Sequence, residues 1–576
     1  MTTLVARPVP ARRGNEQRHA LVAVAHVRLM ILMLLIMAGF VLVIGRIALL
    51  GILSAPAGAA NLAVNPQVRG DILDRNGQPL ARTIDAWTIG VRPPQLLGDR
   101  QDLADSLARL MPGHDAGWYF QKLTMRAKFT YLEKHASPDL VNKVHALGEP
   151  GLVFAREPER LYPQSTMAAH VLGYIGPTAT DAHIAGRAGI ERAFDERLSD
   201  PRRRGEPISL SIDARVQAAM ESELGRAMTN FKAKAATGVV LDVHTGEVIS
   251  MVSLPVYNPN KISGTSSDAL RNNVTQSVYE LGSTFKPIAM AAAINDGVIT
   301  DMTRRFDATK PLKVGRFTIH DDRGDPKRWL NIPETLVYSS NVVTAQIADR
   351  MGKERMAAMF TALGFGERPA IELRERAGPI WPRYWGRTTV MTTAYGHGIA
   401  ITPLHLANAY ATLVNGGIYR PTTLLKVAPG AAPKGRRVLT EATSARMRQL
   451  LRLVVLLGTG RKGDAPGYRV GGKTGTGEIA GAGGYSRSKN VSTFAAAFPM
   501  DAPRYVVVAM LDSPNGTAET FGLTTAAWNA APVVGRVISR TGAMLGVTPD
   551  TSRDIDVSQL LPLVWTGDKK PAATAE

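Results

Sequence analysis

The segment 283–297 restricts the fold more than any other part of this chain. Residues 288–294 are apolar on every side of a helix, which is typical of a helix buried in a domain core rather than one on its surface. Pro287 falls in the first turn, where a missing backbone N–H costs least, and Gly297 predicts the end of the helix. The chain must therefore fold around this helix.

A hydroxyl and an amine stand at the mouth of this helix. Ser283 and Lys286 are three positions apart, so they share one helix face, and the Lys286 amine can reach the Ser283 oxygen. A serine hydroxyl is a poor nucleophile until a base takes its proton. The spacing alone is weak evidence, because Ser486 and Lys489 repeat it in a Gly-rich stretch that we interpret as a loop.

Two downstream motifs strengthen the assignment of Ser283. The tripeptide Ser339-Ser340-Asn341 lies between two stretches of helical pattern. The run Lys473-Thr474-Gly475 occurs once in the chain, is followed by Thr476, and lies in a strand-like context. The three motifs, in this order, resemble the active site of the penicillin-recognising serine acyltransferases, the superfamily of penicillin-binding proteins and serine β-lactamases.

The resemblance implies a role for each polar residue of these motifs. Ser283 is expected to attack a peptide carbonyl, and Lys286 to act as its base, with burial and the charge of Lys473 lowering its pKa. Ser339 is suited to relay a proton. Asn341 is suited to bind substrate backbone and to hold Lys286.

Substrate is expected to bind along the strand that carries Lys473. Its edge can pair with an extended peptide, while the hydroxyls of Thr474 and Thr476 bind the terminal carboxylate. Gly475 and its neighbouring glycines would let the substrate backbone approach closely; they are Gly471, Gly472 and Gly477. The resemblance further implies an oxyanion hole made by the backbone N–H groups of Ser283 and Thr476. We interpret His397 as structural, and we expect Glu280 to face solvent.

The pattern around these motifs predicts an α+β fold, namely a five-stranded antiparallel sheet flanked by helices, as in the penicillin-binding transpeptidases. Asp213 predicts the start of a helix with apolar residues at helical spacing. The five expected strands span residues 237–243, 247–253, 468–478, 492–498 and 505–512. A final helix is expected at about 526–545.

The N-terminal part predicts a membrane anchor. Residues 29–53 are apolar except for Arg46, and a helix of that length would measure about 37 Å, enough to cross a hydrocarbon core. Arginines precede the segment, so the positive-inside rule places the N-terminus in the cytoplasm. A small-residue site at 57–59 leaves a cleaved signal peptide as the alternative, although the apolar region is long for one.

A second domain is expected between the anchor and the catalytic domain. The run from Arg69 to Gly77 resembles the R-G-x-x-x-D-R-x-G motif of class B penicillin-binding proteins, and residues 160–163 and 189–191 match the same domain. Residues 99–148 show an amphipathic helical pattern. We divide the chain into a cytoplasmic basic tail (1–28), a transmembrane anchor (29–53), a mixed α/β pedestal domain (54–205), a transpeptidase domain (206–550) and a C-terminal tail (551–576).

Composition limits the remaining functional classes. The chain has no cysteine, which excludes disulfides and thiolate metal sites. Its net charge of +19 would suit a nucleic-acid binder, but the basic residues are scattered and no recognition motif accompanies them, so we expect no nucleic-acid partner. The eleven histidines are dispersed, and we expect neither a metal nor a cofactor.

The resemblance implies a division-specific D,D-transpeptidase, because Ser-Ser-Asn and Lys-Thr-Gly-Thr look like that type. Expected partners are stem peptides ending in D-Ala-D-Ala, β-lactams, a membrane-embedded glycan polymerase and other division proteins. The expected location is the division site, with the catalytic domain periplasmic. Two alternatives stay open: a hydrolase, either D,D-carboxypeptidase or β-lactamase, and a catalytically idle division scaffold.

Overall fold

The computed structural model describes residues 27–44, 46, 69–178, 184–203, 206–322, 324–481, 484–565 and 567. Residues 1–26 of the predicted basic tail, the linker before Arg69 and the chain end after Gly567 lie outside the described residues. The chain forms two compact units, Met1–Asn65 and Pro66–Glu576.

The first unit contains one apolar helix, Val27–Ile44, which has a mean hydropathy of 2.8 and is long enough to cross a membrane. The predicted anchor coincides with this helix up to Ile44. Gly45 and residues 47–53 of the predicted anchor lie outside the described residues.

The pedestal domain is built on one mixed sheet in the second unit. Strands β3 (Thr130–Ala136), β2 (Pro79–Val91), β1 (Ile72–Leu73) and β7 (Ile208–Ser209) are neighbours in that order, and β4 (Leu152–Leu161) also pairs with β2. Helices α2 (Arg100–Leu110), α3 (Ala116–Thr124) and α4 (Pro138–His145) bury their apolar faces in a small separate core with β2 and β3. Asn76 and Gly77 make the predicted turn between β1 and β2, with Gly77 at φ 84°.

Three motifs that are distant in sequence meet at one buried carboxylate in the pedestal. Arg69 Nε lies 2.8 Å from Glu191 Oε2, and Arg160 Nε lies 2.7 Å from Glu191 Oε1. All three side chains are essentially inaccessible. Tyr162 adds a hydroxyl hydrogen bond of 3.3 Å to the same carboxylate. The motif charges therefore stabilise the pedestal interior.

The β1–β2 turn also contacts the segment that leads into the catalytic domain. The backbone N–H of Arg75 donates to the carbonyl of Ile212 at 2.8 Å. Asp74 accepts from the N–H of Ala214 at 3.2 Å, and Asn76 donates to Asp213 at 3.1 Å. Asp213 itself caps α8 (Ala214–Asn230), as its sequence position predicts. This part of the first motif thus secures the start of the catalytic domain.

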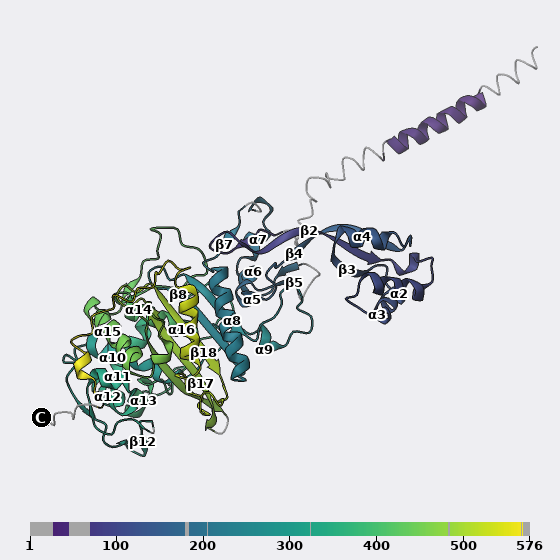
Figure 1. Cartoon of the computed structure of the whole chain (residues 1–576). Helices are drawn as coiled ribbons and strands as arrows, with labels where there is room; N and C mark the ends of the chain where they lie inside the picture. Colours follow the sequence, from purple (N-terminus) through teal and green to yellow (C-terminus); the bar gives the residue numbers. More distant parts are fainter. Residues whose placement is uncertain are drawn as a thin grey trace, which may run out of the picture. The chain divides into compact units, whose positions relative to one another are not determined.

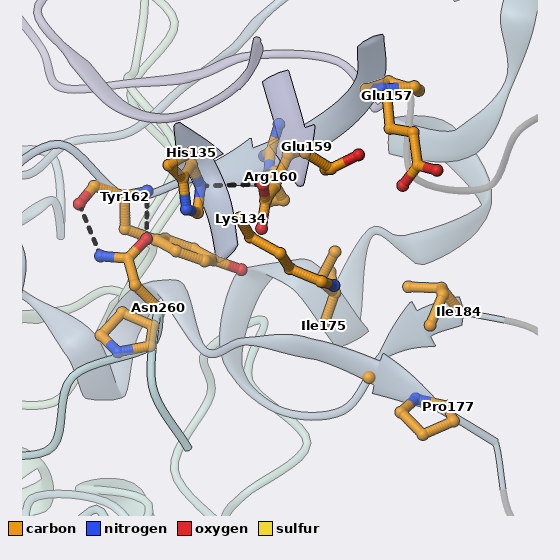
Figure 2. A pocket seen from close by; sticks show the side chains of 14 residues that line it. Lys134, His135, Glu157, Glu159, Arg160, Tyr162, Ile175, Pro177, Ile184 and Asn260 are labelled. Carbon is orange, nitrogen blue, oxygen red and sulfur yellow. Dashed lines mark hydrogen bonds and ion pairs between the residues drawn. The ribbon is translucent and has the colours of Figure 1, made fainter. Parts of the chain in front are cut away.

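A cavity of about 250 Å³ lies where the pedestal meets the loop at Asn260 (Figure 2). There the backbone N–H of Tyr162 donates to Asn260 Oδ1 at 2.9 Å, and Asn260 Nδ2 returns a bond of 3.0 Å to the carbonyl of Tyr162. His135 lies 3.2 Å from Glu159 on the wall of the same cavity. Paired polar groups therefore link the two domains.

The catalytic domain contains the predicted five-stranded antiparallel sheet. Its strand order is β16 (Gly471–Gly481), β17 (Gly484–Phe498), β18 (Tyr505–Asp512), β8 (Ala235–Asp242) and β9 (Val248–Leu254). The strand β16, which carries Lys473, lies at one edge of this sheet.

Helices cover both faces of this sheet. On one face, α8 and α16 (Ala530–Thr541) lie side by side, as Figure 1 shows. Val240 and Val507 pack in that layer, whereas the next residues along the strands, Val239 and Val508, point to the opposite core. The opposite core contains α10 (Lys286–Asn295), α14 (Pro403–Val414) and α15 (Glu441–Leu457). The apolar helix predicted after Pro287 is thus central, and residues 286–293 are all buried.

Three parts of the chain differ from the sequence predictions. The stretch 99–148 contains strand β3 besides its helices, because pairing with β2 outweighs the local helical pattern. Ser486 and Lys489 lie on β17 rather than in a loop, in an irregular part of the strand between Tyr485, which pairs with Ala480, and Asn490, which pairs with Glu478. Residues 551–565 pack on the catalytic domain, with Leu560 and Val564 in its core and Arg452 bound to Asp554 at 2.6 Å.

Candidate active site

Ser283 lies on a 3-10 turn, η3 (Gly282–Phe285), that runs directly into α10. Its side chain is half-buried, while Thr284 and Phe285 beside it are fully buried. The hydroxyl of Tyr410, from α14, donates to the carbonyl of Thr284 at 3.0 Å. Ser283 therefore lies at the N-terminal end of the apolar helix, on a turn that the hydrogen bond from Tyr410 holds in place.

The glycines of β16 and of the serine turn allow these two segments to touch. A Cβ at Gly475 would lie 2.4 Å from the carbonyl oxygen of Leu281, and one at Gly477 would lie 1.8 Å from that of Glu280. Gly282 has a left-handed φ of 54°, and a Cβ at this position would lie 2.6 Å from the carbonyl oxygen of Thr476. We expected these glycines to make room for substrate; the structure assigns Gly475 and Gly477 to the contact with the protein's own serine turn.

The two motif lysines meet at one hydroxyl. Lys286 Nζ donates to Ser339 Oγ at 3.0 Å and also to the Ser339 carbonyl. Lys473 Nζ donates to the same Ser339 Oγ at 2.9 Å. Ser339 holds a left-handed backbone conformation, φ 64°, in the short link between α11 (Ile332–Val337) and α12 (Asn341–Ala362). All three motifs are thereby brought together, as the sequence predicts.

Burial disfavours the charged forms of both lysines, and the charge of Lys286 further disfavours the charged form of Lys473. Lys286 is 1% exposed and Lys473 is fully buried. Burial lowers the pKa of Lys286 to about 8, against a smaller opposing effect of nearby aspartates. Burial, followed by the charge of Lys286, lowers the pKa of Lys473 well below its usual range. A neutral amine is therefore accessible near physiological pH.

The contacts of Lys286 differ from the expectation in two respects. Ser283 Oγ makes no hydrogen bond to any residue that the structure describes, and the lysine contacts Ser339 rather than Ser283. Asn341 was expected to hold Lys286, but its side chain donates to the carbonyl of His320 at 3.0 Å. The carbonyl and hydroxyl of Ser339 hold the lysine instead.

An acidic loop that the sequence analysis did not identify lies near the lysines. Asp321 accepts from Ser340 Oγ at 2.8 Å and from the N–H of Val342 at 2.9 Å, and so fixes the start of α12. Asp322 and Asp325 complete the loop. Burial, together with the charges of Asp322 and Asp321, raises the pKa of Asp325 to about 6. Only the fold brings this loop to Lys286, because 35 or more positions separate them in the sequence.

The predicted substrate-binding hydroxyls already have protein partners. Thr474 Oγ1 shares a hydrogen bond of 2.7 Å with Thr459 Oγ1 and is buried. Thr476 Oγ1 accepts from the N–H of Ala526 at a longer 3.4 Å, and Thr476 is only half-buried. Thr476 is therefore the more accessible of the two to a ligand.

Glu280 is not a solvent-facing residue, contrary to the sequence prediction. The hydroxyl of Tyr485, on β17, donates to both of its carboxylate oxygens at 3.0 Å. His397 Nδ1 lies 3.4 Å from Glu280, whose side chain is only 15% exposed. His397 thus joins the segment before the nucleophile to the β16–β17 hairpin, a structural role that agrees with our interpretation.

Nothing among the described residues forms a cluster of three or more possible metal ligands. The site combines the half-buried hydroxyl of Ser283 with two amines that share the hydroxyl of Ser339. The open edge of β16 runs along the same site.

Comparisons with known proteins agree with this geometry. Residues 236–535 match the penicillin-binding protein transpeptidase domain, and residues 64–202 match the penicillin-binding protein dimerisation domain. The chain therefore belongs to the penicillin-binding transpeptidases, in the class B arrangement in which a dimerisation domain precedes the catalytic domain.

Two of the relatives that match most of this chain are FtsI proteins. The chain is 42% identical to a probable peptidoglycan D,D-transpeptidase FtsI of Caulobacter vibrioides over 497 residues, which cover 84% of this chain and 82% of the relative. It is 30% identical to the peptidoglycan D,D-transpeptidase FtsI of Escherichia coli, with 84% of each chain covered. A crystal structure of a peptidoglycan synthetase from Bifidobacterium adolescentis has the same fold, with a TM-score of 0.63 at 22% identity, covering 85% of this chain and 97% of that one.

Proposed function

We propose that this FtsI-like protein cross-links peptidoglycan at the division septum by D,D-transpeptidation, with Ser283 as its nucleophile. One observation carries the proposal: Lys286 and Lys473, from two distant motifs, both donate to the hydroxyl of Ser339, from the third. A cap or a surface ion pair does not require two buried amines on one hydroxyl. The arrangement suits an acyl transferase, because such an enzyme must take a proton from its nucleophile and return it to a leaving amine.

The first half of the reaction forms an acyl-enzyme. Neutral Lys286 takes the proton of Ser283 Oγ as this oxygen bonds to the carbonyl carbon of the penultimate D-Ala. The C–N bond to the terminal D-Ala then breaks, and Ser339 passes a proton from the lysine pair to the departing nitrogen. The distances of 3.0 and 2.9 Å from Ser339 Oγ to the two amines suit such a relay.

The donor peptide binds along the open edge of β16. Backbone groups of Thr474, Gly475 and Thr476 pair with it, and the hydroxyl of Thr476 binds its terminal carboxylate. The backbone N–H groups of Ser283 and Thr476 form the oxyanion hole; the close contact of Gly282 with Thr476 supports this assignment. Asn341 binds the substrate backbone at the other side of the site.

The second half of the reaction transfers the acyl group. A stem-peptide amine bonds to the acyl carbon, the ester bond to Ser283 breaks, and the amine proton returns through Lys286 to the serine oxygen. β-Lactams acylate the same serine and block it, because their ring carbonyl takes the place of the peptide carbonyl.

The location that we propose is supported by the apolar helix. The helix Val27–Ile44 anchors the chain once in the inner membrane, with the arginine-rich N-terminus in the cytoplasm and the catalytic domain in the periplasm. We assign residues 54–205 to the pedestal and residues 206–550 to the transpeptidase domain. A membrane-embedded glycan polymerase and other division proteins act with it at the septum.

The direct test labels the full-length protein in detergent with a fluorescent penicillin and maps the modified residue by mass spectrometry. The label is expected on Ser283 and is lost in Ser283→Ala. Ser486→Ala is the matched control, because Ser486 starts the second S-x-x-K of the chain and should leave labelling intact. Labelling of another residue would remove the proposed nucleophile.

Two further observations would replace this proposal by its alternatives. Rapid turnover of penicillin without a long-lived adduct would favour a hydrolase. Full complementation of a depleted cell by Ser283→Ala would favour a scaffold.

A further inference from the structure

A second cavity, of about 820 Å³, borders the Ser339-Ser340-Asn341 motif. Its walls come from the hairpin of β11 (Leu312–Val314) and β12 (Phe317–Ile319), from α12 and from α13 (Arg387–Thr393). Val314 and Val342 are among its apolar lining residues, and Lys310, Lys313 and Arg350 are among the basic ones. Its volume lies within the range of cavities that hold small molecules and short peptides.

This cavity is joined to the catalytic motif through two residues. His320 lines it, and the carbonyl of His320 accepts the hydrogen bond of 3.0 Å from Asn341. Val342 also lines it and directly follows Asn341 on the first turn of α12. A ligand held there therefore lies against the segment that carries Ser339 and Asn341.

The charges in the cavity favour an anion. Four basic side chains line it, whereas its acidic residues are Asp307 and Asp349. Asp349 is already bound to Arg387 by two hydrogen bonds of 2.7 Å. Lys310 and Lys313 are exposed, and neither makes an ion pair with any residue in the described part of the chain. Two ammonium groups are thus available at the rim.

The reaction needs a second peptide site. In the proposed function, the donor peptide occupies the edge of β16, so the acceptor must reach the acylated Ser283 from another direction. The acceptor is also a stem peptide, and it carries a carboxylate besides its reacting amine. The basic cavity beside Asn341 meets both requirements, because it is separate from the β16 edge and is positively charged.

We propose that this cavity binds the acceptor stem peptide, with Lys310 and Lys313 pairing with its carboxylate. The inference rests on the proposed function. The bound acceptor presents its neutral amine to the acyl carbon on Ser283; the new C–N bond forms, the ester C–O bond breaks, and the amine proton passes through Lys286 to Ser283 Oγ. Lys310 and Lys313 position the acceptor and take no part in proton transfer.

The test compares two acceptor probes on the full-length protein in detergent. The donor is a pentapeptide ending in D-Ala-D-Ala. The acceptors are a tripeptide with a free side-chain amine and a C-terminal carboxylate, and its C-terminal amide. Cross-linked product is quantified by mass spectrometry at subsaturating acceptor. It is expressed relative to the acyl-enzyme that a fluorescent penicillin forms in the same preparation.

The wild type is expected to form more product with the carboxylate acceptor than with the amide. In Lys310→Gln/Lys313→Gln this ratio should fall about tenfold, because each exposed ion pair contributes a factor of roughly two to five. Lys353→Gln, an exposed lysine of α12 that does not line the cavity, is the control and should keep the preference. An equal preference in the double variant and the wild type would overturn the assignment, as would a wild type without preference. A wild type that forms no acyl-enzyme would instead refute the proposed function.

Discussion

The pedestal and the catalytic domain each bury a cluster of charged groups, but they combine the charges in opposite ways. In the pedestal, two guanidinium groups share one carboxylate, with Arg69 and Arg160 within 2.8 Å of Glu191. In the catalytic domain, Lys286 and Lys473 share a neutral hydroxyl, and neither amine forms an ion pair with a described residue. Both clusters draw their members from motifs that are far apart in sequence.

The difference separates a structural cluster from a reactive one. A buried carboxylate held by two guanidinium groups offsets part of its desolvation cost, so the cluster holds elements together. Two buried amines that make no direct ion pair with a carboxylate cannot both stay charged, so one of them becomes a base. Removing a member should therefore cost stability in the pedestal and activity in the catalytic domain.

The largest effect is expected for Lys286→Met, which keeps the length of the side chain and removes the amine. Acylation of Ser283 by penicillin should fall about a thousandfold, within the range for loss of a general base. The free energy of unfolding should not fall, because the variant no longer buries an amine. Stopped-flow acylation and urea denaturation measure the two quantities. Lys489→Met, from the second S-x-x-K, is the control; a loss of less than tenfold in Lys286→Met would exclude Lys286 as the base.

The second largest effect is expected for Glu191→Gln. The change leaves Arg69 and Arg160 buried without their common carboxylate, which should lower the free energy of unfolding of the pedestal by about 3–5 kcal/mol. Penicillin should still acylate Ser283 in the folded protein at an unchanged rate. The urea concentration at which the pedestal becomes sensitive to protease measures its stability.

The exposed Glu196 supplies the matched control. Glu196→Gln should change the same quantity by no more than about 0.5 kcal/mol. If Glu191→Gln lowered the acylation rate while the pedestal kept its protease resistance, the division between a structural and a reactive cluster would be wrong.

The sequence predicts those parts of the fold and of the site that depend on local patterns. The five strands and the helix capped by Asp213 follow from alternation and spacing, and the apolar run after Pro287 predicts a buried helix that the structure confirms. The family motifs identify the residues that the fold brings to Ser339. Each of these predictions uses residues that are close together in the chain or a motif with a known spacing.

The remaining features depend on long-range packing. Nothing local to Glu280 indicates that Tyr485 will cover it, and nothing local to Asp325 indicates that it will approach Lys286. Gly475 and Gly477 suggested space for substrate, because the sequence does not show that the serine turn packs on β16. The strand that contains Ser486 was missed because β17 pairs with β16 on both sides of that residue, at Tyr485 and Asn490, and the local Gly-rich sequence does not show this pairing.

A third effect is expected in the pH dependence of acylation. The pKa of Lys286 is lowered by burial to about 8, so its neutral fraction rises with pH through that value. The acylation rate should therefore increase between about pH 7 and 9 with a midpoint near 8. Stopped-flow acylation with penicillin across this range measures the midpoint.

The lowered pKa of Lys286 also makes the free energy of unfolding depend on pH. Between pH 8 and the usual lysine pKa of 10.5, the unfolded chain binds more protons at this position than the folded one. Stability should consequently rise with pH across that window, whereas below it the full cost of burying the ammonium remains. The Lys286→Met variant should lack this contribution. A flat rate profile from pH 7 to 9 would contradict the assignment of a buried neutral amine as base.

The smallest effect is expected for Asp325→Asn. The pKa of Asp325 is raised to about 6, so the group is mostly ionised at pH 7, where its charge favours the ammonium form of Lys286. Asparagine keeps an oxygen that can accept from the N–H of Asp322, the bond that Asp325 makes at 3.1 Å. Loss of the charge should lower the pKa of Lys286 further and raise the acylation rate at pH 7 by about two- to fivefold.

The comparison with Asp296→Asn isolates the position of the charge, because Asp296 is an exposed carboxylate just after α10. That control should leave the rate profile in place, while Asp325→Asn moves its midpoint to lower pH. A shift to higher pH would mean that the aspartate loop acts on Lys473 or on the backbone of α12 rather than on the base. The aspartate loop would then have a structural role, like the charged cluster of the pedestal. The reactive cluster of the catalytic domain would consist of the two lysines and Ser339 alone.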